Sequence, residues 1–181
     1  WETYCTVPVK NLGRSGDTTA DLLARFDRDV LPFAPHVLLI MGGVNDYRSG
    51  IYGAESVRNL TVLRDKCRAH GITPVFLTAT PIRPALMAAR MDIMRPPADW
   101  WAHRDRINAW VMQQEYSIDV STVLSDASGQ LEAAYTTDGL HPDLMGKKYI
   151  GQTVDEYLRT HFAYAAGAAE RRAHIFKSTG E

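Results

Sequence analysis

Apolar residues along the chain alternate between short continuous runs and longer stretches with helical spacing. Residues 36–41 and 73–79 are dominated by apolar side chains, which is typical of strands covered on both faces. Two shorter runs, at residues 7–12 and 118–120, are also expected to be strands. Elsewhere apolar residues recur every three or four positions, which predicts amphipathic helices. These helices are expected over residues 18–33, 54–70, 101–116 and from residue 144 towards residue 172.

Strands that alternate with helices of this length predict a three-layer α/β/α sandwich with a mainly parallel, flavodoxin-like sheet. One domain is expected for 181 residues. We assign residues 1–165 to this domain, and residues 166–181 to the end of the last helix and a tail. Apolar residues are expected on the inward faces of three of these helices. They are Leu22, Leu23, Phe26 and Val30 in the first, Val57, Leu60, Leu63 and Cys67 in the second, and Ile150, Val154, Tyr157 and Leu158 in the last.

The segment from Pro81 to Trp101 interrupts this alternation with four prolines and three methionines. It follows the carboxyl end of a strand, where ligands bind in open α/β sheets. Two interpretations stay open: a wall or lid of a binding site, or a surface excursion packed by its own methionines. Trp100, Trp101 and Trp110 are expected to pack in the core or at the rim rather than to form a sugar platform, and His103 is expected on an exposed helix face.

Charge and composition exclude several classes of protein. The chain has 20 Lys and Arg against 21 Asp and Glu, with a formal net charge of −1, so nucleic acid is not an expected partner. The longest apolar run is too short to span a bilayer, so no stable membrane insertion is expected. The two cysteines, Cys5 and Cys67, rule out a disulfide framework and a four-cysteine zinc site, and both are expected to be free thiols.

The beginning of the chain carries no visible signal peptide, which slightly favours a cytoplasmic location over secretion. The first residue is Trp1 rather than Met, so we expect that an N-terminal segment precedes it. The oligomeric state cannot be read from the pattern.

Three short polar segments are candidates for chemistry: residues 11–19, 42–46 and 138–142. Each lies just after a predicted strand or just before a predicted helix. Because such positions meet at one edge of a parallel sheet, we expect the three segments to share that edge.

The third segment contains Asp138 and His141, with Gly139 between them. A turn here can fold the carboxylate onto Nδ1 of the imidazole, which fixes the tautomer of a general base and leaves Nε2 facing a cleft. Taken alone, this spacing is also typical of helix caps and surface turns. His141 is not expected to bind a metal, because no second His or Cys has suitable spacing.

The other two segments offer hydrogen-bond donors. Asn45 follows two glycines at the end of a buried strand, so its amide is either an oxyanion donor or part of a turn. Asp46 is expected to hold that turn. Gly16 is expected at a helix N-terminus, where its backbone N–H is not used by the helix and can serve as a second donor.

Together the three segments resemble the blocks of the SGNH/GDSL hydrolase family. Three blocks occur in the family's order: a glycine-containing block at residues 11–19, Gly-x-Asn-Asp at residues 43–46 and Asp-x-x-His at residues 138–141. The resemblance implies a serine esterase in which Asp138 and His141 are the acid and base of a triad, and Gly16 and Asn45 are oxyanion donors. It implies a small acyl ester as substrate, such as a lipid, a thioester or an acetylated sugar, and no metal or organic cofactor. The opening residues resemble those of small acetylhydrolase-type members.

The family's Gly-Asp-Ser nucleophile block is missing from the 181 residues. The resemblance therefore predicts that the first strand and the nucleophilic serine lie upstream of Trp1. Ser15 is an alternative within a near match to Gly-x-Ser-x-Gly. Ser178 is another, which would require the C-terminal segment to take the place of the first strand, as in a circular permutant; a solvated tail is the preferred interpretation. An O-acyltransferase and a non-catalytic binding module are the alternative functions.

Overall fold

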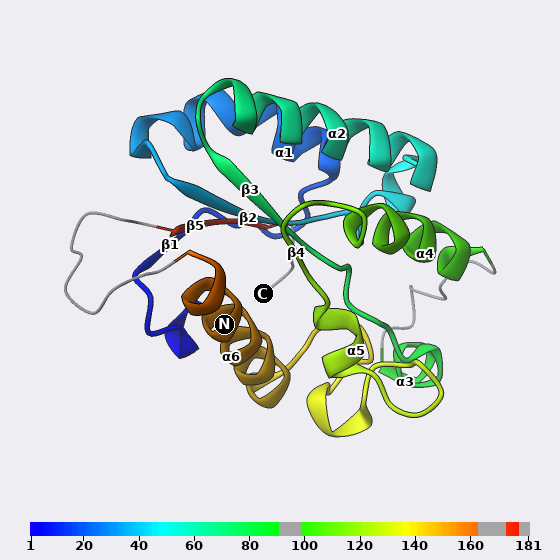
Figure 1. Cartoon of the computed structure of the whole chain (residues 1–181). Coiled ribbons are helices and arrows are strands. Elements are labelled where there is room, and N and C mark those ends of the chain that lie inside the picture. Colours follow the sequence, from blue (N-terminus) through cyan, green and yellow to red (C-terminus); the bar gives the residue numbers. More distant parts are fainter. Residues whose placement is uncertain (91–98, 163–172, 178–181) are drawn as a thin grey trace.

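The computed structural model describes residues 1–90, 99–162 and 173–177. The described strands form one sheet in the order β1-β5-β2-β3-β4, and every neighbouring pair is parallel. Figure 1 shows the sheet between two groups of helices. The strands are β1 (Val9–Asn11), β2 (Val37–Met41), β3 (Thr73–Leu77), β4 (Ser117–Ile118) and β5 (Ala173–Lys177).

Helices pack on both faces of the sheet. On one face lie α1 (Thr19–Asp29), α2 (Gly53–Ala69) and α4 (Trp100–Val111), and on the other lie α5 (Val120–Leu124) and α6 (Leu144–His161). Helix α3 (Pro84–Arg90) lies in the excursion between β3 and β4. Single 3-10 turns cover Glu2–Tyr4, Leu31–Phe33, Tyr47–Ser49 and Ala133–Tyr135.

The two faces of the sheet carry separate apolar cores. Along β2, Leu38 and Ile40 join the core beneath α1, α2 and α4, whereas Val37, Leu39 and Met41 join the core beneath α6. All five residues are buried, as expected for a strand whose alternating side chains are covered on both sides. The predicted three-layer α/β/α sandwich with a parallel sheet is confirmed.

Helix α1 begins with a side-chain cap. The Thr18 hydroxyl accepts from the N–H of Asp21 at 3.2 Å, and the Asp21 carboxylate accepts from the N–H of Thr18 at 2.9 Å, which forms a capping box. The helix ends at Asp29 rather than near residue 33. Pro32 lies in the first turn of the following 3-10 turn, and its missing N–H cannot continue the α-helical bonds.

The C-terminal segment departs from the sequence prediction. The last helix ends at His161, and residues 173–177 form strand β5, which lies between β1 and β2 in the sheet instead of belonging to a tail. Ala173 is in register with Val9 of β1 and Val37 of β2, and Figure 1 shows β5 between these two strands. Two parallel strands separated by one strand width present unpaired backbone groups to the gap, and a strand that fills it satisfies both edges.

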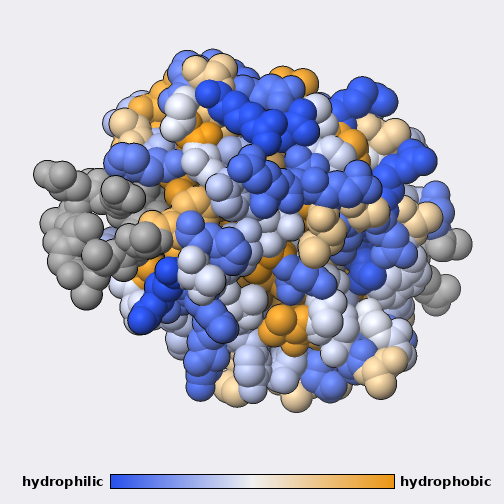
Figure 2. Space-filling view, in the orientation of Figure 1, coloured by the Kyte–Doolittle hydropathy of each residue, from blue (hydrophilic) through white to orange (hydrophobic). Residues whose placement is uncertain are grey.

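Figure 2 shows hydrophilic and hydrophobic residues interspersed over the face seen there. In the described part of the chain, no helix combines the length and apolar character needed to cross a membrane. Cys5 and Cys67 are free thiols, as expected.

Candidate active site

The loop that carries Asp138 and His141 is tied at its base. Thr136 and Pro142 form an antiparallel bridge across it. Inside the loop, one oxygen of Asp138 accepts from the backbone N–H groups of Leu140 and His141, both at 2.8 Å. The other oxygen lies 2.6 Å from Nδ1 of His141. The turn therefore folds the carboxylate onto the imidazole in the manner that the sequence suggests.

This pairing fixes the state of both side chains. Burial alone would raise the pKa of Asp138, but hydrogen bonds from the His141 side chain and from the backbone of His141 and Leu140 outweigh it and lower that pKa below its usual value. An ionised carboxylate only accepts hydrogen bonds, so Nδ1 of His141 carries the hydrogen that it shares with Asp138, and in the neutral imidazole Nε2 is then the nitrogen that accepts a proton. About one third of the His141 side chain is exposed, at 33%, which leaves the ring accessible to a ligand.

Gly139 brings the loop close to the segment after β3. Its φ is +84°, and a Cβ on this residue would lie 2.5 Å from the carbonyl oxygen of Arg83. The N–H of Arg83 donates to the Gly139 carbonyl at 2.7 Å. Residues 81–90 of the Pro81–Trp101 segment therefore pack against the Asp138–His141 loop, which favours the wall interpretation for them. Residues 91–98 lie outside the described residues.

Asp46 holds the turn after β2, as the sequence predicts. Its side chain is fully buried, and its oxygens accept from the N–H of Thr19 at 2.7 Å, the Thr19 hydroxyl at 2.6 Å and the Ser56 hydroxyl at 2.5 Å. The N–H of Asp46 also donates to the Gly43 carbonyl at 3.3 Å. The turn is thereby fastened to the start of α1 and to α2.

Asn45 lies within this turn and reaches the loop that follows β1. Its side-chain N–H donates to the carbonyl of Asp17 at 3.0 Å, next to Gly16 in the chain. Gly16 has a φ of +82°, and within the described residues its N–H makes no hydrogen bond. The N-cap of α1 is Thr18, so Gly16 precedes the helix instead of lying in its first turn. The predicted donor at Gly16 thus belongs to the loop before the helix.

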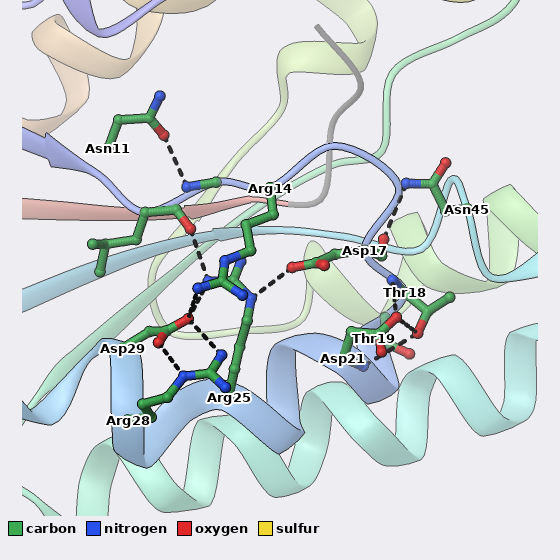
Figure 3. A network of polar contacts seen from close by, with 12 residues as sticks. Asn11, Arg14, Asp17, Thr18, Thr19, Asp21, Arg25, Arg28, Asp29 and Asn45 are labelled. Atoms are coloured by element: carbon green, nitrogen blue, oxygen red, sulfur yellow. Dashed lines mark hydrogen bonds and ion pairs between the residues drawn. The ribbon is translucent and has the colours of Figure 1, made fainter.

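A buried arginine fixes the same loop (Figure 3). Arg25 of α1 is 4% exposed; it donates to the Asp17 carboxylate at 2.6 Å, to the Leu12 carbonyl at 2.8 Å and to Asp29 at 3.2 Å. This role of Arg25 was not predicted from the sequence. The helical spacing could have indicated it: Arg25 lies three residues after Leu22, on the buried face of α1, and a buried charge needs hydrogen-bonding or ionic partners.

His103 of α4 corrects an expectation from the sequence. It was expected on an exposed face, but it is 6% exposed, and its Nε2 lies 2.9 Å from the carbonyl oxygen of Gly43. His103 lies four residues before buried Ile107, and this helical spacing indicates that both residues face the core.

The structure brings the predicted site residues together in two groups. Asn45 and Gly16 form one group around Asp17, and Asp138 and His141 form the other. No hydrogen bond between described residues joins the groups. An apolar cluster of buried Ile82, Met87 and Trp100 is contacted from both sides of the site: Tyr47, which follows the Asn45 turn, and Leu140 of the Asp138–His141 loop pack against it.

The described residues do not identify a nucleophile. Ser15 has an exposed position in the loop before α1, and no described hydrogen bond joins it to His141. Ser178 lies outside the described residues. No group of three or more described His, Cys, Asp or Glu side chains could hold a metal ion.

Comparison with known proteins gives a family and a fold. A family model described as the GDSL-like lipase/acylhydrolase family matches residues 2–149. A curated lipoprotein of Bacillus subtilis, YqeF, described as uncharacterized, is 38% identical over 80 residues, which are 41% of this chain and 33% of the relative. The chain thus spans about a third of that relative's length.

Solved structures show the same fold at low sequence identity. A GDSL-like lipase from Bacteroides thetaiotaomicron is 19% identical, with a TM-score of 0.67 over 80% of this chain and 72% of the other. A lipase/acylhydrolase from Enterococcus faecalis is 20% identical, with a TM-score of 0.65 over 80% and 72%. An acetylxylan esterase from Geobacillus stearothermophilus is 21% identical, with a TM-score of 0.60 over 79% and 68%.

Proposed function

The chain belongs to the GDSL-like lipase/acylhydrolase family, and we propose that it hydrolyses carboxylic esters through the site at the carboxyl edge of its sheet. The observation that carries this proposal is the Asp138–His141 pair, with 2.6 Å between the carboxylate and Nδ1 of the imidazole. This geometry gives a histidine whose free nitrogen is basic and whose protonated form is stabilised by an adjacent carboxylate. Those are the properties that activation of a serine requires.

The reaction has two steps. In the first, Nε2 of His141 takes the proton of a serine hydroxyl, whose oxygen attacks the ester carbonyl carbon; the tetrahedral intermediate collapses, the C–O bond to the alcohol breaks, and His141 gives the proton to the departing oxygen. In the second, His141 takes a proton from water, the hydroxide attacks the acyl-serine, and the acid is released as the proton returns to serine. Asp138 holds the imidazole in the required tautomer throughout.

Gly16 and Asn45 are the proposed oxyanion donors. The bond from Asn45 to the Asp17 carbonyl orients the amide plane beside Gly16. Asp46 and Arg25, each bound to several groups, hold the two loops so that little reorganisation is needed as charge develops. A preorganised donor of this kind contributes about 10²–10³-fold in kcat.

The topology of the sheet supports Ser178 as the nucleophile. The Gly16 loop follows β1 and the Asn45 turn follows β2, and β5 is the strand between them. Lys177, the last residue of β5, is in register with Met41, the last residue of β2. A serine that follows β5 is therefore expected between both donors, and Ser178 is the next residue in the chain. A serine upstream of Trp1 is the alternative that the family resemblance implies.

We propose a short acyl ester as the substrate. The acetylxylan esterase of Geobacillus stearothermophilus, whose fold this chain shares, makes acetylated sugars the first class to examine. A fixed acid and base can pass an acyl group to a second alcohol as well as to water, so the products should be analysed with and without an added alcohol. Transfer at the expense of hydrolysis would indicate an O-acyltransferase.

The decisive experiment is labelling with a fluorophosphonate, followed by peptide mass spectrometry, alongside hydrolysis of p-nitrophenyl acetate. We expect an adduct on Ser178 that is lost in Ser178→Ala and retained in Ser15→Ala. His141→Ala should lower kcat by about 10⁴-fold or more and Asn45→Ala by about 10²–10³-fold. His36→Ala, an exposed residue before the amino end of β2, is the matched histidine control and should leave kcat unchanged.

Each outcome bears on a separate part of the proposal. An adduct on Ser15 or on a peptide upstream of Trp1 would overturn the assignment of Ser178 but keep the esterase. A folded protein with neither adduct nor hydrolysis would overturn the esterase itself and leave a binding module.

A further inference from the structure

Helix α4 contacts the loops that follow two neighbouring strands. The side chain of Asn108 accepts from the N–H of Ala79 at 2.8 Å and donates to its carbonyl at 3.3 Å, just beyond β3. Ile107 lies against Gly43, just beyond β2, so closely that a Cβ on Gly43 would be 2.6 Å from Cδ1 of Ile107. These side chains and His103 fix the position of the helix relative to the carboxyl edge of the sheet.

The contact of His103 is with the turn that presents Asn45. A carbonyl oxygen only accepts hydrogen bonds, so Nε2 of His103 carries the hydrogen that it donates to Gly43 at 2.9 Å. The same carbonyl accepts from the N–H of Asp46 at 3.3 Å, which closes a turn whose first residue is Gly43 and whose third is Asn45. His103 therefore holds one end of the turn, and the buried Asp46 side chain holds the other.

The surroundings of the His103 imidazole do not explain, by stability alone, why this residue is a histidine. The ring packs edge-to-face with Tyr47, with 5.4 Å between ring centroids and an interplanar angle of 87°. Among the described residues its buried Nδ1 has no hydrogen-bond partner. A buried polar atom without a partner costs more free energy than one neutral hydrogen bond contributes. An apolar side chain would fill this space at least as favourably, so stability alone does not account for a histidine here.

We infer that His103 is a positioning residue for the oxyanion donor Asn45, acting through the Gly43 carbonyl. The inference rests on the proposed function, because it concerns the orientation of the Asn45 amide toward the reacting ester. His103 itself touches neither substrate nor nucleophile in this role. Its bond sets the turn before the substrate binds, so its loss affects the transition state more than substrate affinity.

Three substitutions separate positioning from packing. His103→Phe keeps the ring against Tyr47 and removes the donor, whereas His103→Gln places an amide N–H where Nε2 was. Val111→Ala, at a buried residue that ends the same helix and lies eight positions after His103, is the control for lost stability. We expect His103→Phe to lower kcat for p-nitrophenyl acetate about 10-fold or more, with KM within about 2-fold, as for a weakened oxyanion donor. His103→Gln should restore most of kcat, and Val111→Ala should leave kcat unchanged.

A double-mutant cycle with Asn45 gives the sharpest result. If His103 acts through Asn45, His103→Phe should have no further effect on kcat in an Asn45→Ala background. Full additivity of the two losses, an unchanged kcat in His103→Phe, or failure of His103→Gln to restore kcat would each overturn the inference.

A second measurement does not depend on turnover. The side-chain amide signals of Asn45 in a ¹H–¹⁵N spectrum, assigned by their loss in Asn45→Ala, should shift in His103→Phe and return towards their wild-type positions in His103→Gln. The Asn11 amide, which donates to Glu2 near the start of the chain, is the internal reference and should not move. Unmoved Asn45 signals would overturn the positioning role even in a protein without esterase activity, whereas shifted signals without turnover would count against the proposed function alone.

Discussion

Gly139 offers a quantitative test of how tightly the Asp138–His141 loop is packed. Two costs act on Gly139→Ala. The φ of +84° is unfavourable for a residue with a Cβ by about 1–2 kcal/mol. The new Cβ would also lie 2.5 Å from the Arg83 carbonyl oxygen and 2.8 Å from the Met87 nitrogen, and relief of such overlap by backbone movement costs about 1–3 kcal/mol. The free energy of unfolding should fall by about 2–5 kcal/mol.

Gly129→Ala is the matched control. Gly129 has a φ of +76°, but no atom lies within 4 Å of its added Cβ, so only the backbone cost of about 1–2 kcal/mol applies. Both substitutions restrict the unfolded chain equally, and this effect cancels in the comparison. Urea unfolding should therefore show Gly139→Ala to be less stable than Gly129→Ala by about 1–3 kcal/mol. Equal unfolding free energies for the two variants would refute the close packing of the loop against residues 83–87.

Three further predictions follow from the same geometry. The pKa of Asp138 is lowered in the folded state, so its carboxylate stabilises the fold above the unfolded-state pKa of about 3.9 and this contribution is lost as pH falls through the folded-state value. Asp138→Asn should show a flatter loss of stability than wild type in urea titrations below about pH 5, and parallel curves would contradict this. Asp46→Asn presents an amide NH₂ to hydroxyl and N–H donors, so it should lower the unfolding free energy by roughly 1–3 kcal/mol; an unchanged urea midpoint would count against the network. Burial raises the pKa of Cys5 to about 11 and of Cys67 to about 12, so both thiols should react slowly with Ellman's reagent at pH 8 in the folded protein and rapidly after unfolding.

The layers of the fold could be predicted because each depends on a local pattern. The continuous apolar run of β2 and the periodic apolar positions of α1, α2 and α6 are each contained in a short stretch of sequence, so each element can be recognised without knowing its neighbours in space. Helix ends were less accurate. Helix α4 stops at Val111 instead of continuing to residue 116, and the strand expected at 118–120 is reduced to Ser117–Ile118, because Asp119 caps helix α5 through the N–H of Thr122.

The site was predictable as far as its residues belong to short motifs. The Asp138–His141 turn and the role of Asp46 depend on residues close in sequence or on the adjacent helix starts. The residue types in these motifs therefore indicate which hydrogen bonds form. The supports of these loops were not predictable in the same way. Arg25 and His103 act on loops that are distant in sequence, and a single polar residue on a helix gives no indication of which loop it will meet. Their spacing could indicate burial, but only the packing of helices on the sheet identifies Leu12, Asp17 and Gly43 as their partners.

Strand β5 shows why order in space matters more than order in the chain for this type of site. A five-residue strand has no pattern that selects its neighbours, because the edges it pairs with are formed by β1 and β2 near the other end of the sequence. Once those edges exist, any strand in that place ends between the Gly16 loop and the Asn45 turn. If Gly16 and Asn45 are the oxyanion donors proposed above, they fix where a nucleophile is needed, whereas chain connectivity decides only which segment supplies it. A serine after β5 would place the proposed nucleophile last in the sequence, after the proposed donors Gly16 and Asn45 and the proposed acid–base pair Asp138 and His141, with no change in the geometry that the reaction requires.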